Sequence, residues 1–144
     1  MAITQEICNS FKTEILTGTH NFTAAAQTIR IAMYTSAATL NKSTTAYSAT
    51  NEVGNSGTYV AQTASQNLTS VTPVLSTDTA VCDFSDISWT TATITARGAL
   101  IYNNTQANKA IVVLDFGADK TSTNGTFTIT FPAADATNAI IRIA

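Results

Sequence analysis

The chain has 144 residues, a net charge of −2 and 11% charged residues, whereas an average soluble domain has about 25%. Its seven Lys and Arg are spread along the whole length, which argues against nucleic-acid binding because such binding needs clustered positive charge. No run approaches the length of a membrane span, and the N-terminus lacks the pattern of a secretion signal. We therefore expect a single domain, residues 1–144, with neither a nucleic-acid nor a membrane partner.

Threonine occupies roughly a fifth of the positions, far above its average usage. Threonine is β-branched and suits the half-exposed face of a pleated sheet, so this composition favours an all-β fold. The resulting surface is neutral, and a neutral surface is weak at keeping proteins apart. We expect a protein that packs against other proteins.

One stretch, residues 3–17, has the pattern of an amphipathic helix. Thr4 can cap its start and Gly18 can end it. The apolar face needs a partner, which is either the sheet of the same subunit or a neighbouring subunit that the helix clasps. The apolar residues on this face recur at intervals of four: Ile3, Ile7, Phe11 and Ile15. Two of them, Ile7 and Phe11, are candidate interface residues.

The apolar period changes to two from residue 27 onwards, where a strand is expected. Residues 36–57 carry small and polar residues without a period, and long loops of this kind are usually functional or disordered. This loop is the first candidate for a contact surface. Candidate interface residues in the loop and just beyond it are Leu40, Tyr47, Glu52, Val53 and Tyr59.

Further strands are expected at short intervals along the rest of the chain. Pro73 marks an edge strand or a bulge, and Gly98 marks a bulge or a close approach of backbones. The apolar run 110–116 is typical of a central strand, and Asn124-Gly125 is a strong hairpin signal. The expected strands are 58–64, 68–75, 79–84, 89–103 (one strand or a pair), 110–116, 126–131 and the apolar tail 139–144.

These elements predict an all-β fold. We expect an antiparallel β-sandwich or a jelly-roll-like domain over residues 27–144, with one N-terminal α-helix packed on it.

Motifs with chemical meaning are few. Asp115-Phe116-Gly117 matches the magnesium-binding triplet of protein kinases, but the other kinase motifs are missing, and a strand end beginning a turn explains it better. His20 is the only histidine, and it has no Ser or Cys motif beside it that would suggest nucleophilic catalysis. We expect no enzymatic activity and no cofactor.

Acidic side chains near turns raise the possibility of calcium binding. Asp115, Asp119 and Asn124 lie near one turn, and Asp83 and Asp86 lie near another. The spacing and the closing Glu of a dedicated calcium loop are missing, and Asp and Asn are common turn residues. No metal site is expected.

The two cysteines, Cys8 and Cys82, do not have a metal-binding spacing. They are either buried free thiols, which is the favoured interpretation, or a disulfide. Thr-x-Thr repeats occur, but irregularly, so they indicate solvated or partner-covered sheet faces rather than an ice-binding array.

Six segments in this order resemble a family of small virion structural proteins of tailed bacteriophages, and the resemblance extends over nearly the whole chain. They read ICNSFKTEILTGTHNF, IRIAMYTSAATL, AYSATNEV, TITARGALIYN, VLDFGADK and FTITFPAADATNAIIRI. The family is similar to capsid decoration (cement) proteins, which sit on the outer shell and bridge its capsomers. The resemblance implies no catalytic residues.

The resemblance implies a place in the virion, assembled in the cytoplasm of a bacterial host. The expected partners are the major capsid protein or other virion proteins, together with further copies of the chain as a homo-oligomer. Two alternatives remain open: a tail or head–tail connector subunit that forms rings, and a receptor-binding component.

Overall fold

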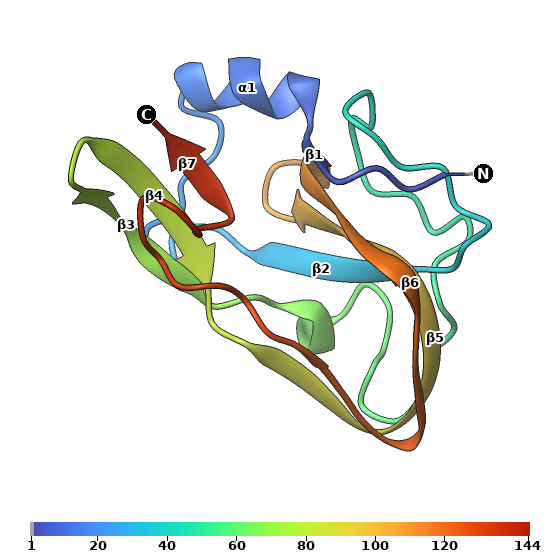
Figure 1. The fold of residues 1–144 in the computed structure, drawn as a ribbon. Coiled ribbons are helices and arrows are strands. Elements are labelled where there is room, and N and C mark those ends of the chain that lie inside the picture. Colours follow the sequence, from blue (N-terminus) through green and yellow to red (C-terminus); the bar gives the residue numbers. More distant parts are fainter. Residues whose placement is uncertain (1) are drawn as a thin grey trace.

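The structure is a computed structural model that describes residues 2–144, and it folds into two antiparallel sheets with a short helix across one end (Figure 1). The expected all-β class with one helix is confirmed. The larger sheet has the strand order β1-β6-β5-β2 and the smaller one the order β3-β4-β7. The elements are β1 (Glu6–Ile7), α1 (Asn9–Leu16), β2 (Ile29–Tyr34), the 3-10 helix η1 (Ala64–Gln66), β3 (Ser70–Ser76), β4 (Thr79–Phe84), β5 (Ile87–Asn103), β6 (Lys109–Ile129) and β7 (Ile141–Ile143).

The larger sheet is built around the long hairpin of β5 and β6. The two strands are joined by a short turn in which Ala107 and Asn108 have positive φ. β6 lies between β1 and β5, and its residues 110–114 are all buried. The central position predicted for this apolar run is therefore confirmed.

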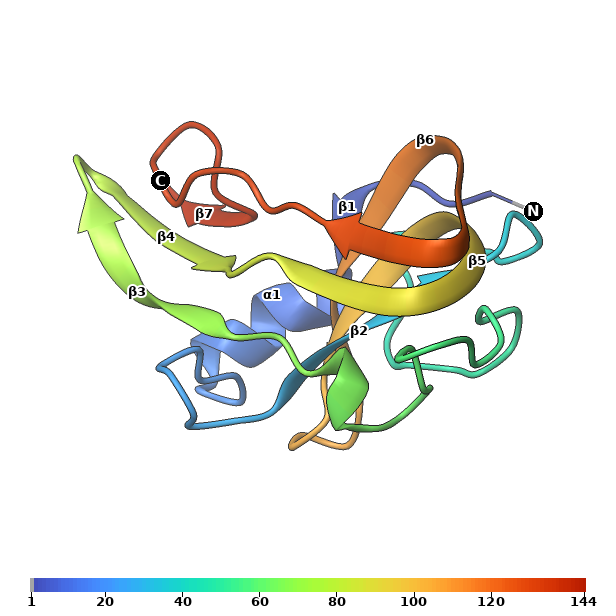
Figure 2. The ribbon, with the colours of Figure 1, turned by 90° about the horizontal axis from the view of Figure 1, so that it is seen from below.

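The hairpin does not continue as a flat ribbon but bends sharply near its far end (Figures 1 and 2). The pairing of β5 with β6 shifts register between Trp89 and Ala92 and again between Ala92 and Ile94. Thr91 on β5 and Asn124 on β6 both have positive φ at this bend. A bulge of this kind curves a strand and increases its twist.

The hairpin turn predicted at Asn124-Gly125 is wrong. Gly125 pairs with Ala92 inside the β5–β6 ladder, and β6 continues to Ile129. The left-handed backbone that Asn tolerates well is used at Asn124 for a bulge within a paired strand, and not for a chain reversal.

The segment around Gly57 fills the inside of this bend. The amide of Thr58 donates to the carbonyl oxygen of Thr90 (3.1 Å), and the amide of Thr90 donates to Oγ1 of Thr58 (2.8 Å). The amide of Thr93 donates to Oγ of Ser56 (2.8 Å). These bonds replace the ladder bonds that the bulge removes, because buried backbone groups need partners. The strand predicted over residues 58–64 is accordingly wrong.

The smaller sheet follows the sequence pattern closely. β3 is an edge strand, and its pairing with β4 shifts register between Val71 and Val74, on either side of Pro73, as predicted. β4 spans the predicted residues, and the C-terminal tail pairs with it as β7.

The helix predicted over residues 3–17 is correct only in its second half. α1 begins at Asn9, whereas β1 pairs with β6 and Ile3 forms a bridge with Leu40. The first residues are extended because open edges of the fold offer them backbone partners. Ile3 also packs against Gly98, where a Cβ would overlap Ile3 and the carbonyl oxygen of Leu114. The predicted close approach at Gly98 is thus confirmed.

A single hydrophobic cluster runs through both sheets. Its largest fully buried side chains include Trp89, Tyr34, Tyr59 and Tyr102. Tyr59 packs edge-on against Trp89, with ring centroids 5.2 Å apart, so that the loop preceding η1 is tied to the bent end of β5. Cys8 and Cys82 are both buried and free, which confirms the free-thiol alternative.

We expect Gly57→Ala to destabilise the fold. Gly57 has φ +56, and a Cβ there would overlap the carbonyl oxygens of Thr90 and Thr91. Left-handed strain and overpacking together should lower the free energy of unfolding by roughly 2–4 kcal/mol. Urea denaturation measures this loss.

Gly54→Ala is the matched control, because no heavy atom lies within 4 Å of a Cβ at Gly54. It should leave the free energy of unfolding within about 1 kcal/mol of the wild type. Equal losses for both variants would show that the segment around Gly57 does not pack in the bend.

Candidate contact surfaces

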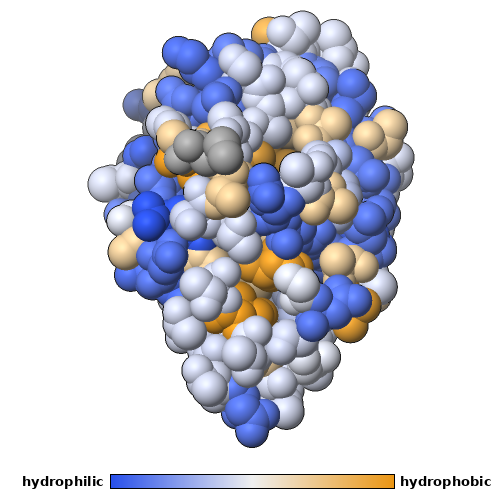
Figure 3. Space-filling model, turned by 90° about the vertical axis from the view of Figure 1, so that its right-hand side faces the viewer, coloured by the Kyte–Doolittle hydropathy of each residue, from blue (hydrophilic) through white to orange (hydrophobic). Residues whose placement is uncertain are grey.

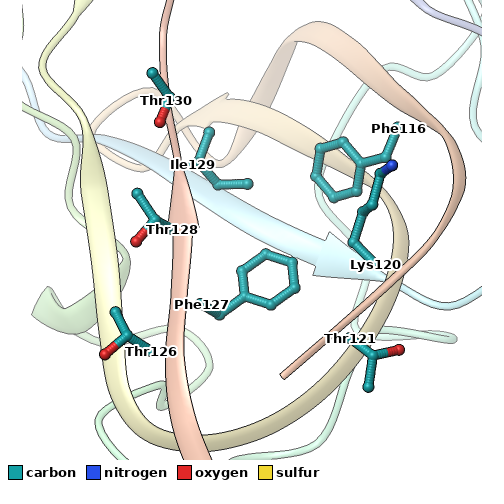
Figure 4. A pocket seen from close by; sticks show the side chains of 8 residues that line it. All are labelled: Phe116, Lys120, Thr121, Thr126, Phe127, Thr128, Ile129 and Thr130. Atoms are coloured by element: carbon teal, nitrogen blue, oxygen red, sulfur yellow. The ribbon is translucent and has the colours of Figure 1, made fainter. Parts of the chain in front are cut away.

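A groove lies between the two arms of the bent strand β6. It has a volume of about 470 Å³ and is lined by Phe116, Lys120, Thr121 and residues 126–130. Figure 4 shows Phe127 and Ile129 pointing across the groove towards Phe116, with Lys120 beside that ring. Thr126, Thr128 and Thr130 point the other way, as the period-two alternation predicts.

A large bulge in β6 forms one wall of this groove. Asp115 pairs with Gly98, and Lys120 pairs with Ala96, so four residues of β6 (116–119) lie opposite Arg97 alone. Gly117 has φ +75, and the Nε of Arg97 contacts Oδ1 of Asp119 at 2.8 Å across the bulge. The bulge diverts this arm of β6 beside Phe116, and no residue pattern indicates its length.

A second hollow of about 500 Å³ adjoins the groove. It shares Phe116, Ile129 and Thr130 with the groove and continues past β1 to Arg142. Seen from this side of the molecule, strongly hydrophobic atoms are visible between residues of intermediate and polar character (Figure 3). We call the two hollows together the β6 trough. The ammonium group of Lys120 forms no hydrogen bond or ion pair with any residue in the range 2–144.

The smaller sheet carries a second uncovered apolar surface. Leu75 pairs with Ala80, and Ala80 pairs with Ile143, so the three side chains form a row across β3, β4 and β7. Leu75 is 71% exposed and Ile143 is 56% exposed. We call these three residues the apolar row. The neighbouring pair Cys82 and Ile141 on the same face is buried, so the face is covered by the body of the protein at one end only.

The candidate interface residues from the sequence do not form this surface. Four of them, Phe11, Leu40, Val53 and Tyr59, are buried in the core of the subunit. Contacts within the subunit already cover these four side chains, so their place in an interface stays a prediction. The other three, Ile7, Tyr47 and Glu52, are partly buried.

Loop 36–57 is packed against its own subunit. The amide of Val53 donates to the carbonyl oxygen of Met33 (2.9 Å), and the amide of Ala110 donates to that of Thr45 (3.0 Å). The loop therefore adds short stretches of pairing to the edges of β2 and β6. Residues without an apolar period form these bonds through their backbone, which is why the sequence pattern did not reveal them.

Glu52 connects this loop to the segment around η1 through hydrogen bonds. Its carboxylate accepts hydrogen bonds from the hydroxyl of Tyr47 (2.5 Å), the hydroxyl of Tyr59 (2.7 Å) and Nε2 of Gln66 (2.7 Å). Burial raises the pKa of Tyr59, and the charge of Glu52 raises it further, so the phenol stays protonated and donates. The polar residues of this cluster bind one another, and this explains their presence without a ligand.

His20 is 5% exposed and lies in a cluster of polar side chains beneath α1. Its Nε2 contacts Oε2 of Glu14 at 2.8 Å, and its Nδ1 contacts Nδ2 of Asn103 at 3.0 Å. Both ring nitrogens are thus engaged within the subunit, and the imidazole has no free position for a substrate. The sequence offered no sign of these partners.

The acidic residues considered for calcium are occupied in other ways. Asp119 pairs with Arg97, and Oδ1 of Asp115 accepts the amide of Gly117 at 2.9 Å. In residues 2–144, no three side chains of His, Cys, Asp or Glu come together in a way that could hold a metal ion. The triplet Asp115-Phe116-Gly117 lies inside β6, where it begins the bulge described above.

Asp83 is the one acid in the described chain whose carboxylate is buried without a full set of partners. It is 1% exposed; Oδ1 accepts the amide of Phe84 (2.9 Å), whereas Oδ2 has no hydrogen-bond partner. Burial raises the pKa of Asp83, and the charges of Asp135 and Asp86 raise it further.

Comparisons of this chain with family models, with curated proteins and with solved structures found no match. None of the helices in residues 2–144 has the length and apolar character that crossing a membrane requires.

We expect Asp83→Asn to gain stability relative to the wild type as the pH rises from about 3 to 7. Because the pKa is raised in the folded state, Asp83 contributes stability below its unfolded pKa and loses that contribution as the pH rises through the folded pKa. Asn does not titrate. Urea denaturation of both proteins across this range measures the difference.

Asp78→Asn serves as the control, because Asp78 is exposed in the turn between β3 and β4. Its difference from the wild type should stay nearly constant over the same range. A constant difference for Asp83→Asn as well would contradict the buried, partly unsatisfied carboxylate.

Proposed function

We propose that this protein is a structural component of a tailed-bacteriophage particle that decorates and stabilises the outer shell. The resemblance of six consecutive segments to small virion proteins supports the phage assignment. The low content of charged residues, 11%, supports a role in which subunits pack together, because few charges need to be removed from water at a contact.

The observation that carries the decorating role is the placement of the two candidate contact surfaces. The apolar row lies at the end formed by β3, β4 and β7, and the groove between the two arms of β6 lies towards the end where β5 and β6 bend (Figures 1 and 2). A subunit with contact surfaces at two separate ends can hold two neighbours at once. A shell protein that bridges capsomers needs this property.

Both surfaces are carried by strands of the two sheets and not by free loops. Their side chains are therefore held in place before binding, which reduces the entropy lost on association. Each surface is small for a stable pairwise interface, but many identical contacts over a closed shell act together. The proposed partners are the major capsid protein or other virion proteins, including further copies of this chain.

Copy number in purified particles tests the proposal. A decoration protein should be present in hundreds of copies spread over the shell, whereas a tail or connector subunit should be present in multiples of three or six. Quantitative gel analysis of particles, together with binding of the purified protein to emptied capsids, measures this. Retention of the protein only in isolated tails would overturn the decorating role.

We expect Leu75→Glu to lower incorporation into particles at least tenfold without unfolding the protein. Leu75 is 71% exposed, so the fold does not need it, but a charge there would be buried without a partner in the contact. Thr23→Glu is the control, because Thr23 is exposed in the segment between α1 and β2 and belongs to neither surface. Normal incorporation of Leu75→Glu would exclude the apolar row as a contact.

A further inference from the structure

The hydrogen bonds around His20 determine which of its nitrogens carries a proton. The orientation of the Gln27 amide can be assigned first, because its oxygen and nitrogen each face a backbone group. A backbone N–H can only donate a hydrogen bond, and a backbone carbonyl oxygen can only accept one. The amide of Asn21 donates to Oε1 of Gln27 (2.8 Å), and Nε2 of Gln27 donates to the carbonyl oxygen of Thr19 (3.0 Å). The orientation of the Gln27 side chain follows from these two bonds.

Gln27 in turn orients Asn103. Oε1 of Gln27 accepts a hydrogen bond from Nδ2 of Asn103 (2.7 Å), and Oδ1 of Asn103 accepts the backbone amide of Gln106 (3.2 Å). The amino group of Asn103 therefore faces Nδ1 of His20, at 3.0 Å. Since that group can only donate, Nδ1 must accept, and the imidazole carries its proton on Nε2.

The Nε2–H of His20 donates to Glu14, which also binds Lys109. Oε2 of Glu14 lies 2.8 Å from Nε2 of His20, and Oε1 lies 3.0 Å from Nζ of Lys109. Glu14 belongs to α1, and Lys109 is the first residue of β6. This cluster thus ties the helix to the β5–β6 hairpin.

α1 has few other attachments. Phe11 is its only buried residue, Leu16 is 87% exposed, and the residue before the helix makes no side-chain capping bond. A helix of eight residues is not stable by itself in water, so it depends on its tertiary contacts. Loss of the cluster should therefore release it.

We infer that Glu14, His20, Asn103 and Lys109 form an acid-sensitive latch that holds α1 against the β5–β6 hairpin at neutral pH. A second proton on His20 would sit on Nδ1 and face the amino group of Asn103, so two donors would oppose each other. Rotating the Asn103 amide would not solve this, because it would break the bonds to Gln27 and Gln106. Protonation thus costs at least one hydrogen bond in every arrangement. The added charge would face Glu14, but that carboxylate is already paired with Lys109, whose ammonium group opposes a second cation in the cluster.

The surroundings of the imidazole do not offer another acceptor. The rings of Phe11 and Phe22 lie against it, with centroids 5.0 and 6.3 Å away. The ionisable groups packed around the cluster are Glu14 from α1, Lys109 from β6 and the Cys8 thiol, whose charge state is coupled to Glu14.

The Cys8 thiol and the Glu14 carboxylate keep their charge states in mild acid. Burial, together with the charge of Glu14, raises the pKa of Cys8 to about 11, so the thiol is neutral at and below pH 7. Partial burial raises the pKa of Glu14, but the hydrogen bonds from His20 and Lys109 outweigh it and lower the pKa overall. Glu14 keeps its charge in mild acid, whereas imidazoles generally titrate between pH 5 and 8.

Hydrogen–deuterium exchange of the amides in residues 9–16 tests the latch at pH 7 and pH 5, with rates corrected for the intrinsic effect of pH. We expect the protection of the α1 amides in the wild type to fall by about tenfold between pH 7 and pH 5. Uptake of one proton can change the opening equilibrium by up to tenfold for each pH unit, so a loss of this size is within reach of a single group. Amides of β6 in residues 111–114 should keep their protection and serve as the internal reference.

His20→Gln is the matched control, because Gln offers one acceptor and one donor but does not titrate. Its α1 protection should be the same at pH 7 and pH 5. Asn103→Asp is a second variant, in which a carboxylate faces Nδ1 and favours the doubly protonated imidazole. Its α1 should be better protected at pH 5 than at pH 7.

Two outcomes would overturn the inference. One is unchanged protection of α1 in the wild type at pH 5. The other is an equal loss of α1 protection at pH 5 in the wild type and in Asn103→Asp. That result would mean that the group that takes up the proton lies outside the cluster. These outcomes are independent of whether the protein decorates a phage shell.

Discussion

β5 and β6 stay paired with each other over 17 and 21 residues although the ribbon bends sharply on the way. A paired ribbon can bend only where residues leave the ladder, and the free backbone groups then need other partners. At the bend those partners come from Ser56 and Thr58, and Gly57 lets their segment approach closely. The course of the long segment between β2 and η1 is thus set by the hydrogen-bonding needs of a bent hairpin.

The same requirement explains why so polar a segment is so well packed. Residues 36–57 give backbone hydrogen bonds to the edges of β2 and β6, and Glu52 gathers two tyrosine hydroxyls and the amide of Gln66. The candidate interface residues of this region lie largely inside the subunit for that reason. What remains for a partner is the exposed apolar row and the hollows of the β6 trough.

The separation between polar clusters inside the subunit and apolar surfaces on its strands is consistent with the proposed role in binding other virion proteins. The polar side chains around Glu52 and His20 form their hydrogen bonds with one another, and these bonds hold segments of the chain together. The uncovered surfaces are apolar and lie on strands, where their positions are determined by the sheets. The helix α1 is the exception, since a few polar contacts hold it and a change in protonation can weaken them.

Local patterns in the sequence determined the all-β class, the span of β4, the edge position of β3 at Pro73, the buried central run of β6 and the alternation of Phe127 and Ile129 with threonines. These features depend on neighbouring residues alone, because side-chain period and the backbone limits of proline act locally. Tertiary structure alone decided that Asn124-Gly125 is a bulge, that residues 3–8 are extended, that loop 36–57 is covered and that the four-residue bulge opens the β6 trough. Each of these depends on backbone partners supplied by residues distant in the sequence, and one chain segment does not reveal which distant groups will be left needing a bond.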